Sequence, residues 1–223
     1  MRFLRQILAI VQKDIAAELR TKENLSAMVV FSLLVLVIFN FAFELQGLDI
    51  TVVGSGVLWT AFTFSGILGL GRSFAAEKDK GSLEGVLLSP VDRGAVFLGK
   101  AISNFLFITV MEAVTLPLFA VLNNATIPWF PLVPYVVMGT IGFAAMGTLL
   151  SAIAASTKMR EVMLPILLFP VTVPLLMAAV KLTGGALQAR DFSEITNWLS
   201  ILIAYDAIFV VVAFWVFEYV VEE

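Results

Sequence analysis

Few side chains in this sequence could carry out chemistry, because the two most reactive types are missing. The 223 residues include no cysteine and no histidine. The first absence rules out disulfides, thiolate metal sites and cysteine nucleophiles. The second removes zinc-type sites, an imidazole ligand for haem and the usual proton-relay base. We therefore expect no catalytic residues, no metal site, no directly bound cofactor and no enzymatic activity.

Two carboxyl groups lie inside long apolar stretches. Glu112 falls near the middle of the stretch 101–122, and Asp206 in the outer half of 198–219. A carboxylate at the centre of a bilayer costs about 3 kcal/mol on insertion scales, so each should face protein or water. Either the two line a pathway, or they are protonated and simply hydrogen-bonded. Two carboxyls without a base, nucleophile or metal do not make a hydrolase.

A glycine-rich segment imitates a phosphate-binding loop. Gly94 to Lys100 fits the spacing G-x-x-x-x-G-K. However, Ala101 stands where a serine or threonine should reach magnesium, no strand precedes the segment, and an apolar helix follows. Nucleotide binding is not predicted here, and Lys100 is expected to anchor its helix at the membrane interface.

The elements that would position these groups are membrane helices. The chain is 60% hydrophobic and 14% charged, whereas about a quarter of an ordinary soluble sequence is charged. No basic run suggests nucleic-acid binding. Six stretches are long enough to cross a hydrocarbon core of about 30 Å. They are 25–45, 52–71, 101–122, 131–156, 162–182 and 198–219. We predict an all-α polytopic membrane protein whose residues 1–223 form a single transmembrane domain.

The segment 1–22 predicts an additional helix that does not cross the membrane. Its apolar residues recur at three and four positions, and its basic residues take the other side. This pattern is typical of an amphipathic helix in the membrane interface. A signal peptide is disfavoured, because a compact apolar region and a small-residue cleavage site are missing.

The distribution of lysine and arginine predicts the topology. With the N-terminus inside, twelve of the fourteen basic residues lie on the cytoplasmic side, and only Lys181 and Arg190 lie outside. Both termini are then cytoplasmic. Residues 183–197 are expected to form an exterior segment, with Leu187, Phe192 and Ile195 along the membrane surface.

The predicted cytoplasmic loop 72–100 contains a candidate contact for another protein. Ser82 can cap a short helix that runs through Leu83 and Leu87 and stops before Pro90. Such a helix exposes an apolar face between two spans, and exposed apolar faces usually mark a protein contact. The alternative is that its leucines lie in the lipid interface.

Two spans have unusual compositions. The fifth contains Pro165, Pro170 and Pro174. Each proline frees a backbone carbonyl, so this span should be kinked and packed within protein, as a moving element or a static bend. The fourth span, 131–156, is rich in glycine and alanine. These favour close helix packing within the subunit or, alternatively, a dimer seam.

The loop and the proline-rich span together resemble the CcmB family of haem exporter subunits. The family's loop pattern is an acidic residue, then Gly, a small residue, Leu-Glu, two leucines and Ser/Thr-Pro. It is met by Glu77, Gly81, Ser82, Leu83, Glu84, Leu87, Leu88, Ser89 and Pro90. Lys100 matches a lysine that opens the third span, and Phe169 to Pro174 resembles the family's proline stretch.

The resemblance implies a type-2 ABC exporter-like permease in the bacterial inner membrane. Two copies would pair with two copies of an ATPase, CcmA, and residues 82–89 would form the coupling helix that docks on it. Partners would include CcmC, CcmD and the haem chaperone CcmE, in cytochrome c maturation. ATP would be bound by the partner, and haem would be the molecule handled. The alternatives are a type-2 ABC permease for a lipid, drug or polysaccharide, and a membrane scaffold that transports nothing.

Overall fold

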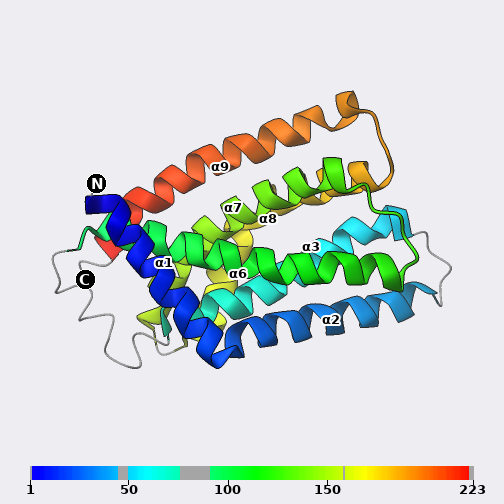
Figure 1. Ribbon diagram of the computed structural model, residues 1–223. Coiled ribbons are helices and arrows are strands. Elements are labelled where there is room, and N and C mark those ends of the chain that lie inside the picture. The colour runs from blue at the N-terminus through cyan, green and yellow to red at the C-terminus, as the bar shows by residue number, and fades with distance from the viewer. Residues whose placement is uncertain (1, 45–49, 76–90, 158, 221–223) are drawn as a thin grey trace.

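The described part of the chain is a bundle of long α-helices (Figure 1). A computed structural model describes residues 2–44, 50–75, 91–157 and 159–220. Its helices are α1 (Arg2–Thr21), α2 (Glu23–Glu44), α3 (Ile50–Ser73), α6 (Arg93–Leu122), α7 (Trp129–Ala155), α8 (Arg160–Leu187) and α9 (Phe192–Val220). All except α1 are long and apolar enough to cross a membrane. The predicted all-α fold with six spans is confirmed.

The six long helices run side by side and alternate in direction. The described chain begins and ends at the same end of the bundle, which we call the terminal end (Figure 1). The α7–α8 turn lies there too, whereas the α6–α7 and α8–α9 turns lie at the opposite, distal end. This arrangement places both termini on one side, as the distribution of basic residues predicts.

Helix α7 is the centre of the bundle. It packs against α3, α6, α8 and α9, and its small residues receive large side chains from these neighbours. A Cβ atom added to Gly139 would collide with the indole ring of Trp59, and one added to Gly147 would collide with Leu70. Of the two predicted uses of the small residues, packing within the subunit is the one observed.

The third span begins earlier than predicted. Asp92 caps α6, because its Oδ1 accepts a hydrogen bond of 2.8 Å from the backbone N–H of Gly94. Lys100 therefore lies about two turns inside the helix, where its exposure is 3%. The expectation that Lys100 anchors the helix at the membrane interface is wrong, since its side chain is enclosed by protein.

The predicted exterior segment 183–197 is also wrong in large part. Helix α8 continues to Leu187 and α9 begins at Phe192, so only residues 188–191 connect them. Ile195 is buried, and its Cγ2 would lie 2.6 Å from a Cβ added to Gly185. Gly185 allows the start of α9 to pack directly on α8. Glycine has a low helix propensity, which is why the sequence did not predict that α8 continues to Leu187.

Helix α8 contains all three predicted prolines without interruption. Pro170 and Pro174 lie on its exposed face, and Pro165 is half-buried. The opposite face, which includes Leu168 and Leu175, is fully buried. The span is therefore packed against α3, α7 and α9 on one face, while Pro170 and Pro174 are exposed on the other.

Candidate functional site

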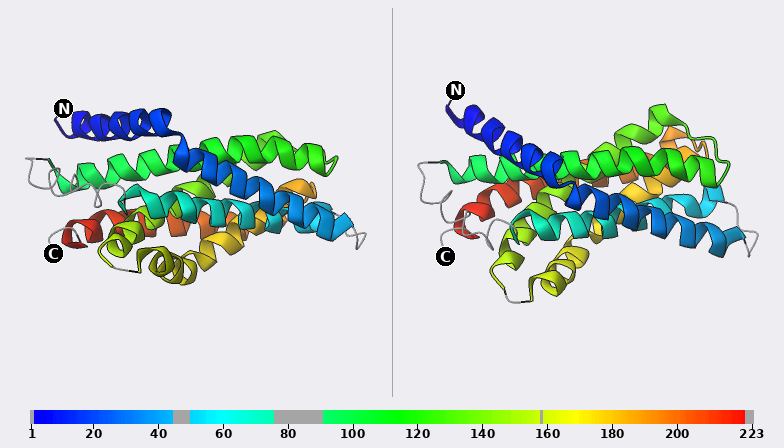
Figure 2. Two further views of the ribbon diagram at one scale, coloured as in Figure 1. Left: turned by 90° about the horizontal axis from the view of Figure 1, so that it is seen from below. Right: turned by 60° about the horizontal axis from the view of Figure 1, so that its bottom comes forward.

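The terminal end of the bundle is organised around the contact between α1 and α6. Helix α1 crosses the beginning of α6 obliquely (Figures 1 and 2). Ile7 and Val11 of α1 form a small buried cluster with Ala95 of α6. One turn further, a Cβ added to Gly99 would lie 2.8 Å from Cβ of Ile10. The small residues of α6 thus allow the two backbones to approach closely.

The other face of α1 is exposed and amphipathic. Leu4, Leu8 and Leu19 are each more than half exposed. The basic residues of the helix accompany them at the surface: Arg2, Arg5, Lys13 and Arg20. An apolar stripe flanked by cations is typical of a helix at a lipid headgroup layer. Helix α1 is therefore amphipathic as predicted, with one face committed to α6 and the other available to lipid.

Lys100 joins three helices at this end. Its ammonium Nζ lies 3.1 Å from Oδ2 and 3.2 Å from Oδ1 of Asp14 on α1. It also donates a 3.2 Å hydrogen bond to the carbonyl oxygen of Ser73, the last residue of α3. The ring of Phe74 lies 5.5 Å from the same nitrogen, within cation–π range. A buried cation here has both a counter-charge and a backbone acceptor.

A second acid of α1 holds the beginning of α2. The carboxylate Oε1 of Glu18 accepts a 2.8 Å hydrogen bond from the backbone N–H of Leu25. Glu18 is 8% exposed, and its oxygen satisfies one of the amides that a helix N-terminus leaves without an intrahelical partner. The chain turns between α1 and α2 at Lys22, whose φ is 56°. Helix α1 is thus attached to α2 as well as to α6.

The predicted coupling segment lies in the sequence between α3 and α6. Helix α3 ends at Ser73 and α6 begins at Arg93, both at the terminal end. The predicted contact residues fall outside the described residues. They are Glu77, Gly81, Ser82, Leu83, Glu84, Leu87, Leu88 and Pro90.

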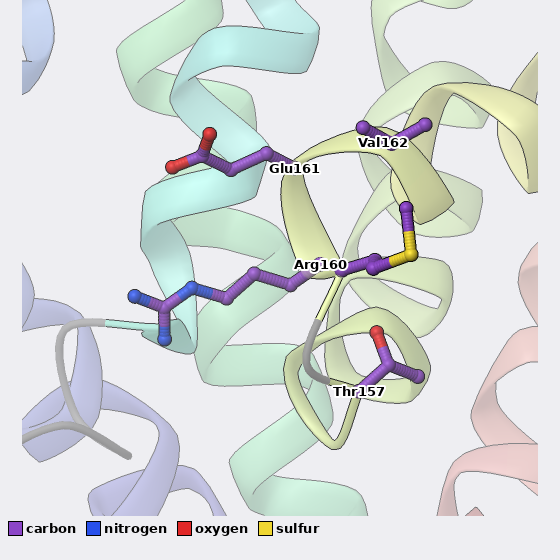
Figure 3. Close-up of a pocket in the computed structure, with 5 residues that line it drawn as sticks. Thr157, Arg160, Glu161 and Val162 are labelled. Atoms are coloured by element: carbon purple, nitrogen blue, oxygen red, sulfur yellow. The ribbon is translucent and has the colours of Figure 1, made fainter.

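A hollow of about 450 Å³ lies at the α7–α8 turn of the same end (Figure 3). It is lined by Thr157, Met159, Arg160, Glu161 and Val162. In Figure 3 the side chains of Arg160 and Glu161 extend to the same side of the turn, while Val162 points away from them. The second connection at the terminal end therefore also presents charged side chains.

The two carboxyl groups inside the spans are not brought together. Glu112 is 3% exposed and accepts a 2.7 Å hydrogen bond from the hydroxyl of Thr140 on α7. Asp206 of α9 lies instead against Gly142, where an added Cβ would collide with its Oδ1. Thr140 and Gly142 are two residues apart, which corresponds to a rotation of about 200° about the axis of α7. The two acids therefore contact opposite sides of α7. Glu112 is enclosed, which favours the hydrogen-bonded interpretation over a pathway.

This geometry predicts that Thr140→Val destabilises the protein by about 2 kcal/mol, because the buried Glu112 carboxyl loses a donor. Removing both polar groups in Glu112→Leu/Thr140→Val should recover most of that stability, since no carboxyl then remains buried. Thermal unfolding of the purified variants in mild detergent measures the difference. Equal stability of Thr140→Val and the double variant would contradict the importance of this hydrogen bond.

The fold and the terminal end define a multi-pass helical membrane protein with an amphipathic helix docked beside its third span. The model of the protein family described as CcmB protein matches residues 5–222. The chain belongs to the CcmB family.

Curated relatives with the name "Heme exporter protein B" cover most of the chain. The protein from Rhodobacter capsulatus is 27% identical over 175 residues, which are 78% of this chain and 80% of the relative. The one from Paracoccus denitrificans is 26% identical over 88% of this chain and 91% of its own length. The one from Pseudomonas aeruginosa is 25% identical over 83% of each. The chain is therefore similar to these proteins over most of its length.

Proposed function

We propose that this protein is the membrane permease subunit of an ABC transporter for haem export and cytochrome c maturation. The observation that carries the proposal is the family match over residues 5–222, together with relatives named heme exporter protein B. Six apolar helices of membrane-spanning length support a permease role. The bacterial inner membrane is the proposed location, with both termini in the cytoplasm, because twelve of fourteen basic residues then lie inside.

The energy would come from a separate ATPase similar to CcmA. The described residues form long helices joined by short turns. Residues 94–100 lie within α6 and not in a loop before it, which disfavours phosphate-loop chemistry there. The ATPase would dock on the segment 82–89, whose sequence predicts an amphipathic helix. ATP hydrolysis would then drive haem export or the release of the loaded haem chaperone. The chain itself has no histidine to bind haem iron, so CcmC-like, CcmD-like and CcmE-like partners would handle haem.

The exposed face of α8 supports a homodimer or another protein neighbour. Pro170 and Pro174 lie on this face and free the carbonyls of Ile166 and Pro170. Free carbonyls facing hydrocarbon are unfavourable, by several kcal/mol for each unsatisfied group. A second subunit packed against α8 would remove that cost.

Deletion of the gene tests the function directly. We expect covalently bound haem in c-type cytochromes to disappear from membrane extracts separated on denaturing gels and stained for haem. A plasmid copy of the gene should restore the signal. Secretion of a protein that uses an unrelated export route should continue, since the general membrane machinery is intact. Normal levels of c-type cytochromes in the deletion strain would refute the proposal, and a loss of lipid or polysaccharide export instead would favour a general export permease.

A further inference from the structure

We propose that Lys100 is a positioning residue for energy coupling. It holds the end of α3, and with it the start of the segment that leads to the ATPase, against α1. The inference rests on the proposed function, because it assigns a route for the ATPase-driven movement. Lys100 contacts neither ATP nor haem in this proposal and acts through the helices that it joins.

The contacts of Lys100 fall at the end of α3. The carbonyl of Ser73 belongs to the last turn of α3, where backbone carbonyls lack intrahelical partners and the helix dipole is negative. Phe74, the next residue, lies below the ammonium and is 1% exposed. The ammonium group of Lys100 thus binds the end of α3, from which the chain continues into residues 76–90. Arg93, at the return of the chain, lies on the same helix as Lys100.

The contacts of Lys100 extend through α1 to α2. Asp14 connects Lys100 to α1, and Glu18, one turn further along α1, holds the N-terminus of α2. A displacement of the α3 end would therefore be transmitted through α1 to the first span. Gly99 leaves no room for a side chain beneath Ile10, so α1 packs closely on α6 at this point.

The alternative role of the Lys100–Asp14 pair is stability alone. Side-chain exposures of 4% for Lys100 and 11% for Asp14 make this a buried ion pair. Apolar residues of similar volume often replace such a pair with no loss of stability, whereas breaking it on one side is costly. Stability alone is therefore a weak reason for a lysine at this position. A link to the Ser73 carbonyl is something that only a donor can provide.

The decisive variant is Asp14→Leu/Lys100→Met, which removes both charges and keeps the packing volume. It should assemble with the ATPase and unfold at a temperature close to that of the wild type. We expect the yield of holocytochrome per unit of ATP hydrolysed to fall by about tenfold, within the range typical of coupling between two sites. Measurement requires the purified complex for ATP turnover and haem-stained membranes from the same cells for cytochrome.

Two further variants separate coupling from folding. Lys100→Arg keeps a buried donor and should retain most of the coupling. Lys13→Met removes the neighbouring lysine, whose side chain is 48% exposed and also near Asp14, and it should behave as the wild type because exposed ion pairs contribute little.

Wild-type coupling in Asp14→Leu/Lys100→Met would overturn the positioning role and reduce the pair to packing. That result would leave the proposed function untouched, since the deletion strain tests the function independently. Loss of coupling in Lys13→Met to the same extent would also overturn the proposal, because the effect would then follow local charge rather than the buried contact.

Discussion

Gly139→Leu is expected to prevent the protein from accumulating in the membrane in a folded form. A side chain at this position of α7 would enter the space of the Trp59 ring. Trp59 cannot move away without loss, because it is 3% exposed and its Nε1 donates a 3.0 Å hydrogen bond to Thr183 on α8. Overpacking and the loss of this buried hydrogen bond together cost about 3 kcal/mol. Size-exclusion chromatography of a fluorescent fusion in mild detergent should show aggregate in place of a symmetric peak.

Gly56→Leu is the matched control for this prediction. Gly56 lies on α3 less than one turn before Trp59, and a Cβ added there would meet no atom within 4 Å. The same increase in volume should therefore leave the elution profile and the melting temperature close to those of the wild type. If both leucine variants aggregate equally, the junction of α3, α7 and α8 is not the reason for the effect.

The fold was largely predictable from the sequence because membrane-spanning length is a strong constraint. Each predicted span overlaps one observed helix, and the errors lie at the ends. Helix α6 begins at Arg93 rather than at 101. Asp92 caps it, and α1 packs over its first turns, so the polar residues before 101 are also helical. Hydropathy detects the apolar part of a helix and cannot detect an extension that another helix shields.

The junction around Lys100 was missed because its parts are distant in the sequence. Lys100 and Asp14 are separated by 86 residues, and a lone lysine near a span is usually explained by the interface. A signal was nevertheless present in 1–22. Asp14 and Glu18 continue the same helical stripe as Ile7 and Val11, at spacings of three and four residues. Acids in the apolar stripe of a basic helix indicate buried partners.

The orientation of α8 shows a different limit. Its three prolines predicted a kinked span, but the sequence could not specify which face meets α7. The observed face is set by Leu168, Leu175 and the small residues Ala178 and Ala179, all fully buried. Pro170 and Pro174 are left outside. The family resemblance, in contrast, depended on patterns in the loop and in the proline-rich span, and it is confirmed by the family match over residues 5–222.

Leu87→Asp is expected to abolish stimulation of the ATPase and the co-purification of the two proteins. The residues Leu83 and Leu87 are one turn apart in the predicted coupling helix, so they would share the apolar face that enters the partner's cleft. A carboxylate placed in such a contact must lose its hydration without gaining a cation, which costs several kcal/mol and weakens binding by at least about a hundredfold. Glu84→Arg should have a similar effect, because it reverses a charge beside that face. Affinity purification in mild detergent, followed by ATPase assays of the eluate, measures both outcomes.

Gly85→Asp provides the control, since it introduces the same charge two residues from Leu87 and from Leu83, on the opposite side of the predicted helix. Its complex should retain ATPase stimulation. The anchored ends of the segment, at Ser73 and Arg93, are unchanged in all three variants, so a loss confined to Leu87→Asp and Glu84→Arg would assign the contact to one face of 82–89. Full stimulation in both would instead move the ATPase contact elsewhere on the terminal end, with the α7–α8 hollow beside Arg160 and Glu161 as the next surface to mutate.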